Sequence, residues 1–269
     1  MHTARELPSN KSIDKKVAVA LTIAGSDPSG GAGIQADLKV FGAFRVYGLS
    51  VVSALTAQNS REVKAVSPVD SGFLKKQLSV LLADLKPDAL KTGMLYSAAN
   101  IEAVASVIIK NRLSNAVVDP VLISSSGRRL SSPGVVAAFR KHLLPLSTVV
   151  TPNMHEASAL AGIEVSTMED MKEAARILRN LGARNVIITG GHLDRTAADV
   201  FYDGEFRILR DRKMAGEYHG TGCRFSAAIA ALLAKGSSAA EAASQAKDFM
   251  RESLQSTFST GKGMRLFNV

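Results

Sequence analysis

Short runs of apolar residues alternate along this chain with longer segments in which apolar residues recur at helical spacing. The runs at 17–24 and 47–56 are apolar along most of their length, as in strands covered on both faces. The same pattern predicts shorter strands at 89–92, 116–119, 147–151 and 185–189. Helical spacing predicts helices at 34–44, 71–83, 98–112, 133–143, 169–181, 221–235 and 238–258.

This alternation predicts an α/β fold with a mostly parallel central sheet that helices cover on both faces. The rhythm changes at 199–209, where Asp203-Gly204 between two strand-like runs predicts a β-hairpin with a tight turn. No repeat and no long linker divides the chain. We therefore expect one domain over residues 17–269, preceded by a polar tail at 1–16.

The composition narrows the class of protein. Apolar residues are 46% of the 269 residues, which is too many for a disordered chain. No segment has the ~18 uninterrupted apolar residues that a membrane helix needs. The single cysteine excludes an internal disulfide, and residues 1–16 lack the apolar stretch of a secretion signal. These features predict a cytoplasmic protein that does not enter a membrane.

The formal net charge of +9 allows three kinds of partner: nucleic acid, an acidic surface or small anionic molecules. The basic residues are scattered in short runs, and the aromatic residues, 5% of the chain, are not interleaved with them. A nucleic-acid interface needs such clustering and stacking platforms. The charge therefore favours phosphorylated small molecules, with nucleic acid as the weaker alternative.

In a parallel sheet, ligands bind beyond the carboxyl ends of the strands. A glycine-rich segment at 25–33 follows the first predicted strand. Glycines let a ligand approach the backbone closely, but a purely structural turn has the same composition. The spacing matches neither the dinucleotide fingerprint nor the P-loop, so both interpretations stay open.

A stronger signal is His219-Gly220-Thr221-Gly222-Cys223 at the start of an alanine-rich helix. Unpaired amides at a glycine-rich helix start bind anions, which suits a phosphoryl group in transfer. The helix field also lowers the pKa of a thiol in the first turn, so we expect Cys223 to be a reactive thiolate. The alternative is that Cys223 is a small buried hydrophobic residue.

Polar residues follow several other predicted strands. Asp119 and Glu156 offer the carboxylate oxygens that Mg²⁺ prefers, and Asn153 lies beside them. Asn153 and Glu156 also have the spacing of a capping box, and the two interpretations are compatible. The amide of Gln58 offers a donor and an acceptor, as the edge of an aminopyrimidine requires; a loop role is the alternative.

Taken together, these motifs resemble the bacterial hydroxymethylpyrimidine/phosphomethylpyrimidine kinases, which belong to the ribokinase-like superfamily. The resemblance runs from about residue 17 to 263. It is carried by LTIAGSDPSGGAGIQADLK, TAQNS, LKTGML, VVDPV, TPNMHEA, GGH, HGTGC and a final GKG, in this order. It implies a three-layer α/β/α fold, the cofactors ATP and Mg²⁺, and a homodimer.

The resemblance implies two successive transfers of the ATP γ-phosphoryl group, first to 4-amino-5-hydroxymethyl-2-methylpyrimidine and then to its monophosphate, in thiamine diphosphate biosynthesis. It assigns catalysis to Cys223 and the anion site at Gly220, Thr221 and Gly222. It assigns the remaining roles as follows: substrate binding to Gly25, Asp37, Gln58, Met94 and Val121; ATP and phosphate binding to Asn153, Thr189, Gly191 and Lys262; and the metal to Asp119 and Glu156.

Three residues depart from the family pattern: Thr189 where lysine is frequent, His155 where proline is usual, and Arg224 where threonine usually follows the cysteine. The loss of a lysine at Thr189 would weaken ATP phosphate binding. Arg224 would either compensate with its charge or lie on the surface. The alternatives to the main function are a pyridoxal- or pyridoxine-type vitamin kinase and a pyrimidine-binding regulator without turnover.

Overall fold

Nine strands form one sheet in the order β3-β2-β1-β4-β5-β6-β7-β8-β9. The computed structural model describes residues 17–124, 126–191, 197–212, 214 and 216–268, so the predicted tail at 1–16 lies outside it. Strands β2, β1, β4, β5, β6 and β7 run parallel, whereas β3, β8 and β9 pair antiparallel at the two edges. The strands are β1 Val19–Ser26, β2 Tyr47–Gln58, β3 Val63–Pro68, β4 Ala89–Thr92, β5 Ala116–Val118, β6 Val149–Val150, β7 Asn185–Ile188, β8 Ala197–Tyr202 and β9 Phe206–Asp211.

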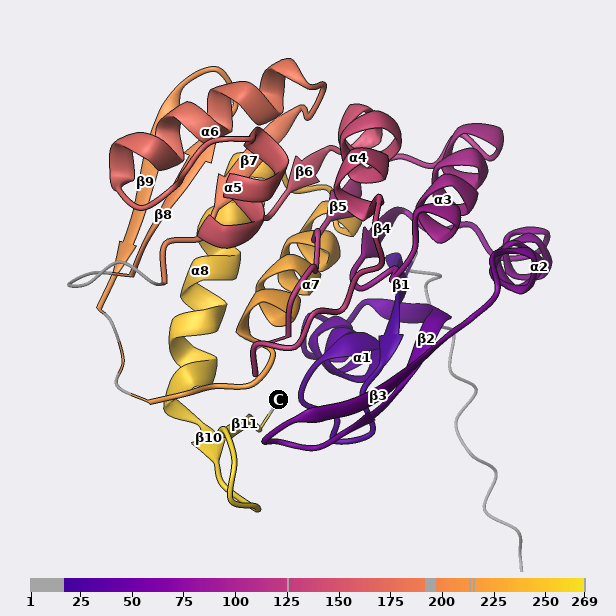
Figure 1. Ribbon diagram of the computed structural model, residues 1–269, viewed down its shortest axis with the longest axis horizontal. Coiled ribbons are helices and arrows are strands. Elements are labelled where there is room, and N and C mark those ends of the chain that lie inside the picture. The colour runs from indigo at the N-terminus through magenta and orange to yellow at the C-terminus, as the bar shows by residue number, and fades with distance from the viewer. Residues whose placement is uncertain (1–16, 125, 192–196, 213, 215, 269) are drawn as a thin grey trace, which may run out of the picture.

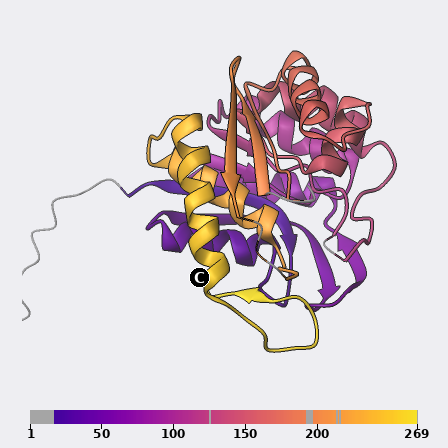
Figure 2. The ribbon, with the colours of Figure 1, turned by 90° about the vertical axis from the view of Figure 1, so that its left-hand side faces the viewer.

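Helices cover both faces of this sheet (Figure 1). One layer contains α1 Gly33–Ala43, α7 Thr221–Ala234 and α8 Ala239–Gln255, which contact one another. The other contains α2 Ser71–Leu82, α3 Ala98–Lys110, α4 Val135–Ala138, α5 Met154–Ala161 and α6 Met168–Asn180. Figure 2 shows α8 on one side of the sheet and α5 and α6 on the opposite side. The predicted mostly parallel, three-layer architecture is confirmed.

The strands are apolar along their length because each contributes to two cores. In β4, Leu90 packs in the core beneath α2 to α6, and its neighbour Ala89 packs in the core beneath α1, α7 and α8. Both side chains are completely buried. Burial on both faces removes the polar half of the alternation that an exposed sheet would show.

The structure differs from the predicted elements at four places. The helix predicted at 133–143 is the short α4 followed by a π-helical turn, Phe139–Leu143. The last helix ends at Gln255, and the next residues form β10 Thr257–Phe258, which pairs with β11 Leu266–Phe267. Strand β3 has no counterpart in the prediction, and of helix α5 only the start was predicted, by the capping-box spacing of Asn153 and Glu156. Strand β3 lies at the exposed sheet edge, where few residues are buried, and α5 has eight residues, so neither repeats its pattern long enough to be recognised.

Candidate active site

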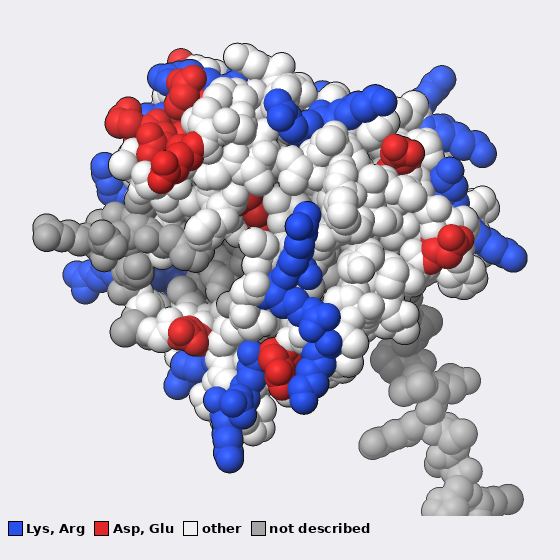
Figure 3. All heavy atoms as spheres, viewed as in Figure 1, with Lys and Arg blue, Asp and Glu red and all other residues white. Residues whose placement is uncertain are grey.

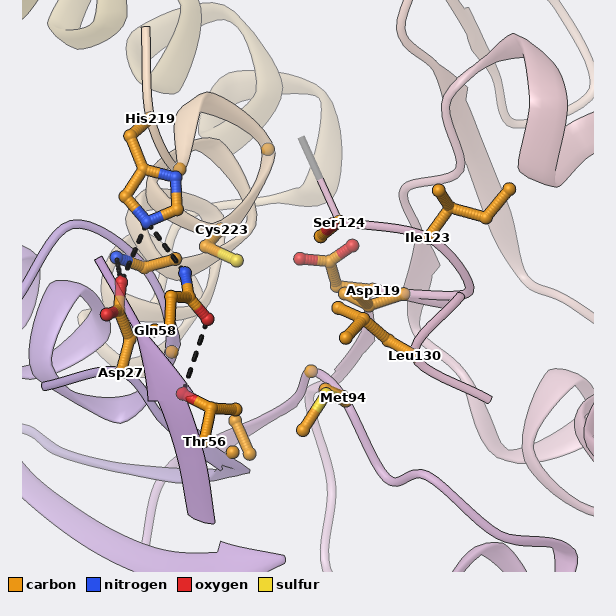
Figure 4. Close-up of a pocket in the computed structure, with 18 of the residues that line it drawn as sticks. Asp27, Thr56, Gln58, Met94, Asp119, Ile123, Ser124, Leu130, His219 and Cys223 are labelled. Carbon is orange, nitrogen blue, oxygen red and sulfur yellow. Dashed lines mark hydrogen bonds and ion pairs between the residues drawn. The ribbon is translucent and has the colours of Figure 1, made fainter. Parts of the chain in front are cut away.

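A pocket opens at the carboxyl ends of the parallel strands, where the loops after β1, β4, β5, β6 and β7 meet the start of α7 (Figure 4). The fold brings most of the predicted site residues to this one place, as expected for a parallel sheet. Those that line the pocket are Gly25, Gln58, Met94, Asp119, Val121, Asn153, Glu156, Thr189, Gly220, Gly222 and Cys223.

Four predicted site residues do not line the pocket. Thr221, Gly191 and Lys262 are exposed outside it, so their roles stay predictions. Of the GGH motif, His192 lies outside the described residues. Asp37 requires a correction. It is completely buried on the inner face of α1, where its carboxylate accepts hydrogen bonds from Lys91 Nζ at 2.8 Å and Thr22 Oγ1 at 2.6 Å. Because no part of it reaches the cavity, Asp37 is not placed to bind the substrate.

The start of α7 has the backbone features that the sequence predicts for an anion site. Gly220, the N-cap, has a φ of 76°, and a side chain there would collide with the carbonyl oxygen of Gly31. No side chain caps the first turn. The backbone amides that follow Gly220 are therefore available to an anion, as the glycine-rich motif predicts.

Cys223 is half-buried, and its sulfur faces the pocket (Figure 4). Desolvation by burial raises the pKa of this thiol to about 12, although Lys91 opposes the shift; Asp119 and Asp37 add to it. The expectation of a lowered thiol pKa is therefore wrong for the ligand-free protein. The helix field is outweighed because the sulfur has lost water and lies near buried carboxylates.

Beneath the sulfur lies a buried cation that the sequence analysis did not assign. Lys91 is completely buried in β4, contacts both oxygens of Asp37 at 2.8 and 2.9 Å, and lies 3.7 Å from Asp119. Its attraction to Asp37, Cys223 and Asp119 outweighs desolvation and raises its pKa, so it stays charged. The signal for it was the LKTGML motif, in which a lysine interrupts an otherwise buried strand.

Asp119 and Glu156 lie together at the pocket wall. Ser226 Oγ donates to Asp119 at 2.9 Å, and the Glu156 carboxylate accepts from the amides of Asn153 at 3.0 Å and Leu122 at 3.3 Å. Asn153 in turn accepts from the Glu156 amide, so the predicted capping box is confirmed.

Electrostatics make this pair fit a divalent cation. Burial raises the pKa of Asp119, and burial together with the Asp119 charge raises the pKa of Glu156 to about 8. Two buried carboxylates that disfavour each other's charge are relieved by a hard cation. Among the described residues no cluster of three or more acidic, histidine or cysteine ligands exists. A site with two carboxylates suits Mg²⁺, which keeps several of its waters.

Two more residues of the pocket were not assigned by the sequence analysis. His219 Nε2 lies 2.8 Å from Asp27 Oδ2 and 2.9 Å from the amide of Gln58 (Figure 4). Both His219 and Asp27 are buried. They are separated by 192 positions in the chain, and the only signal for them was their presence in the quoted glycine-rich motifs.

Arg224 fits neither expectation. It is completely buried and does not line the pocket. Its guanidinium lies 4.6 Å from the centre of the Phe267 ring and donates to the carbonyl of Gly31. It therefore joins the C-terminal strand β11 to the glycine-rich loop.

Thr189, which also departs from the family pattern, lines the pocket. Within the described residues no lysine or arginine lines it.

The surface charge agrees with scattered basic residues. On the face shown in Figure 3, Lys and Arg form several separate groups with Asp and Glu among them. No helix in the described part of the chain is long and apolar enough to cross a membrane.

The fold and the pocket together define a small-molecule kinase of the ribokinase-like class.

Comparison with known proteins identifies the family. The family model for phosphomethylpyrimidine kinase matches residues 27–268. A hydroxymethylpyrimidine/phosphomethylpyrimidine kinase of Bacillus subtilis is 43% identical over 248 residues, 91% of this chain and 92% of that protein. The chain belongs to the phosphomethylpyrimidine kinase family.

Two further relatives bear on the function. A thiamine biosynthesis bifunctional protein of Geobacter sulfurreducens is 43% identical over 246 residues, which are 90% of this chain but 50% of that protein. The chain thus spans about half the length of this relative. An ADP complex of Bacillus subtilis pyridoxal kinase superposes with a TM-score of 0.86 at 40% identity, covering 93% of this chain and 96% of that one.

Proposed function

We propose that this protein transfers the ATP γ-phosphoryl group to the hydroxymethyl oxygen of 4-amino-5-hydroxymethyl-2-methylpyrimidine, and then a second one to the monophosphate, in thiamine biosynthesis. The observation that carries the proposal is that the uncapped start of α7, with Cys223, lines the same pocket as Gln58. One cavity thus holds an anion site beside an amide that pairs with a ring edge.

In this proposal, Gln58 pairs with the amino group and ring nitrogen, while Gly25, Met94 and Val121 surround the ring. A side chain on Gly25 would lie 2.6 Å from Met94 Cε, so the glycine leaves space for this methionine, which lines the pocket. The amides of residues 220–223 hold the phosphoryl group as it moves from ATP to the hydroxymethyl oxygen. Positioning and charge neutralisation supply most of the catalysis in such transfers.

We assign acceptance of the hydroxyl proton to Cys223. For this role the sulfur must be a thiolate, and the groups that stabilise a thiolate there are Lys91 and the backbone amide of Gly33. Asp119 and Glu156 would hold Mg²⁺, which neutralises phosphate charge when bound. We assign ATP and phosphate binding to Asn153 and Thr189, which line the pocket, and to Gly191 and Lys262, which lie outside it.

The direct test is incubation with Mg²⁺-ATP and the aminopyrimidine alcohol, followed by mass spectrometry. The proposal expects the monophosphate first and the diphosphate later, each with stoichiometric ADP. Omission of the alcohol controls for ATP hydrolysis. Absence of both phosphates, with ATP and the alcohol nevertheless bound, would favour a pyrimidine-binding regulator.

A second candidate substrate is pyridoxal. It is favoured by the close superposition on a pyridoxal kinase structure. The same assay with pyridoxal in place of the aminopyrimidine measures this, and a higher kcat/KM for pyridoxal would reverse our order of preference.

We also propose that the protein acts as a cytoplasmic homodimer. Large apolar side chains that one chain leaves exposed on neighbouring elements support this: Leu55 on β2, and Phe73 and Val80 on α2. Phe73 is 58% exposed. Sedimentation equilibrium of the wild type and of Phe73→Ser tests the proposal, which expects a dimer that the substitution weakens.

A further inference from the structure

One nitrogen of His219 faces two polar groups at once. His219 Nε2 lies 2.8 Å from Asp27 Oδ2 and 2.9 Å from the nearer end of the Gln58 amide (Figure 4). The histidine side chain is 6% exposed, and a side chain on Gly31 would collide with its ring. The ring is therefore held in one position between the glycine-rich loop and Gln58.

The hydrogen between Asp27 and His219 belongs to the histidine. Asp27 already accepts from the amides of Ser29 and Ala32, each at 2.8 Å, and from the Ser29 hydroxyl at 3.0 Å. Burial raises the pKa of Asp27, but the hydrogen bonds from His219 and Ser29 outweigh it and lower that pKa. An ionised Asp27 requires a donor opposite it, so His219 Nε2 carries its hydrogen.

The second nitrogen of the ring supports the neutral form. Nδ1 of His219 is buried and has no hydrogen-bond partner among the described residues. A charged imidazolium would bury a second N–H donor without an acceptor, which is costly. The neutral ring with its hydrogen on Nε2 avoids that cost.

Thr56 lies at the opposite end of the Gln58 amide. Its hydroxyl is 2.9 Å from the carbonyl oxygen of Ser26 and 3.3 Å from Gln58. A carbonyl oxygen only accepts, so the single hydroxyl hydrogen goes to Ser26, and Thr56 offers Gln58 a lone pair. At its His219 end the amide faces a protonated nitrogen, which has no lone pair for an amide N–H and whose one hydrogen an oxygen can share with Asp27; at its Thr56 end it faces an acceptor.

Hydrogen-bond partners decide which end of a glutamine amide is oxygen, because the two ends have almost the same shape. The partners of Gln58 place its oxygen beside His219 and its nitrogen beside Thr56. The edge of the amide that remains free then presents an acceptor on the His219 side and a donor on the Thr56 side.

We propose that Asp27 and His219 are positioning residues that fix the orientation of the Gln58 amide, and that this orientation decides which way the substrate ring lies. This inference rests on the proposed function. With the oxygen beside His219, the 4-amino group pairs there and the neighbouring ring nitrogen pairs on the Thr56 side. The hydroxymethyl group, at the next ring position beyond the amino group, then lies on the side of Cys223.

A reversed amide would turn the ring over. The amino group would pair beside Thr56, and the hydroxymethyl group would be carried away from Cys223, which lies at the His219 end of Gln58 in Figure 4. The Asp27–His219 pair would thus act on specificity without touching the reacting atoms.

The first test compares two rings that differ only at this edge: the 4-amino alcohol and its 4-oxo analogue, which exchanges the donor and the acceptor. Calorimetric Kd values are measured for wild type, for His219→Phe, which keeps a ring but removes the N–H, and for His142→Phe. His142 does not line the pocket. We expect wild type and His142→Phe to favour the amino ring by about 5- to 150-fold. In His219→Phe the preference should fall below about threefold.

The second test uses the wild type and so does not depend on the folding of a variant. Nitrogen-15 NMR of the imidazole should show Nε2 of His219 protonated and Nδ1 bare. A bare Nε2 would overturn the inference, as would equal weakening of both rings in His219→Phe. The proposed function fails separately, if wild-type protein binds the amino ring but phosphorylates neither alcohol.

Discussion

The ammonium of Lys91 lies 3.7 Å from the carboxylate of Asp119, and both side chains are buried. Lys91 is bound more tightly to Asp37, at 2.8 Å. It therefore neutralises charge on two carboxylates: Asp37, which is buried in the core, and Asp119, which lies at the proposed metal site. Removing it would leave two carboxylates buried without a cation.

We expect Lys91→Met to lower the free energy of unfolding by about 3–5 kcal/mol, because it leaves buried charge unpaired. Urea denaturation measures this. The double variant Lys91→Met/Asp37→Leu should recover part of the stability, because an apolar pair replaces one ion pair while Asp119 stays without its cation, but not the kinase activity. A stable double variant with wild-type turnover would contradict an electrostatic role for Lys91 at the site.

Cys223→Ser should reduce kcat by about 10²–10⁴-fold, the range that a general base contributes. The Kd for ATP should remain within a factor of a few, because the amides that bind phosphate belong to the backbone. Stopped-time assays and calorimetry give the two values. Turnover near that of the wild type would remove Cys223 from the role of base.

Alkylation of Cys223 should be slow at pH 7 and rise with pH. A pKa raised to about 12 leaves little thiolate at neutral pH, and the thiolate is the reactive form. The rate with iodoacetamide should therefore increase through pH 10 without a plateau, as followed by the mass of the intact protein. The mass increase reports on Cys223 alone, because the chain has one cysteine. A plateau near pH 7 would indicate a stabilised thiolate instead.

Glu156 should make the protein less stable as pH rises. Its pKa is raised from 4.5 to about 8, so between those values the folded state keeps a proton that the unfolded state has lost. Stability contributed by this group therefore falls through that window, by at most about 1.4 kcal/mol per pH unit. Glu156→Gln should flatten the curve measured by urea denaturation from pH 5 to 8. Parallel curves for variant and wild type would contradict the raised pKa.

Two glycine substitutions should have opposite effects. Gly220→Ala puts a methyl group against the Gly31 carbonyl at a positive φ and should abolish most activity. Gly42→Ala, in the exposed last turn of α1, meets nothing within 4 Å and should stabilise the protein by about 0.5–1 kcal/mol. Thermal unfolding and the kinase assay distinguish them, and an active Gly220→Ala would argue against the anion site.

Most of the fold could be predicted because local patterns determine it. The apolar strand predicted at 89–92 and the helix predicted at 71–83 appear where expected. The hairpin about Asp203-Gly204 is also confirmed. Strand β3 was missed because its residues are largely exposed, so its pattern is weak.

The place of the candidate site could also be predicted, since parallel strands bring their following loops to one edge. The environment of each residue within it could not. Asp37 belongs to a motif that resembles a binding segment, yet α1 turns it into the core. Arg224 follows a catalytic-type cysteine, yet it packs on Phe267 from the far end of the chain.

By itself the sequence determined the order of strands and helices, the family, and the edge of the sheet where the chemistry lies. These depend on periodicity and on motifs that are contiguous in the chain. Only the tertiary structure decided which groups lose water and which charges become neighbours. The raised pKa of Cys223, the buried Lys91 and the contact of His219 with Asp27 arise between distant segments, and desolvation and Coulomb energy depend on distances in space.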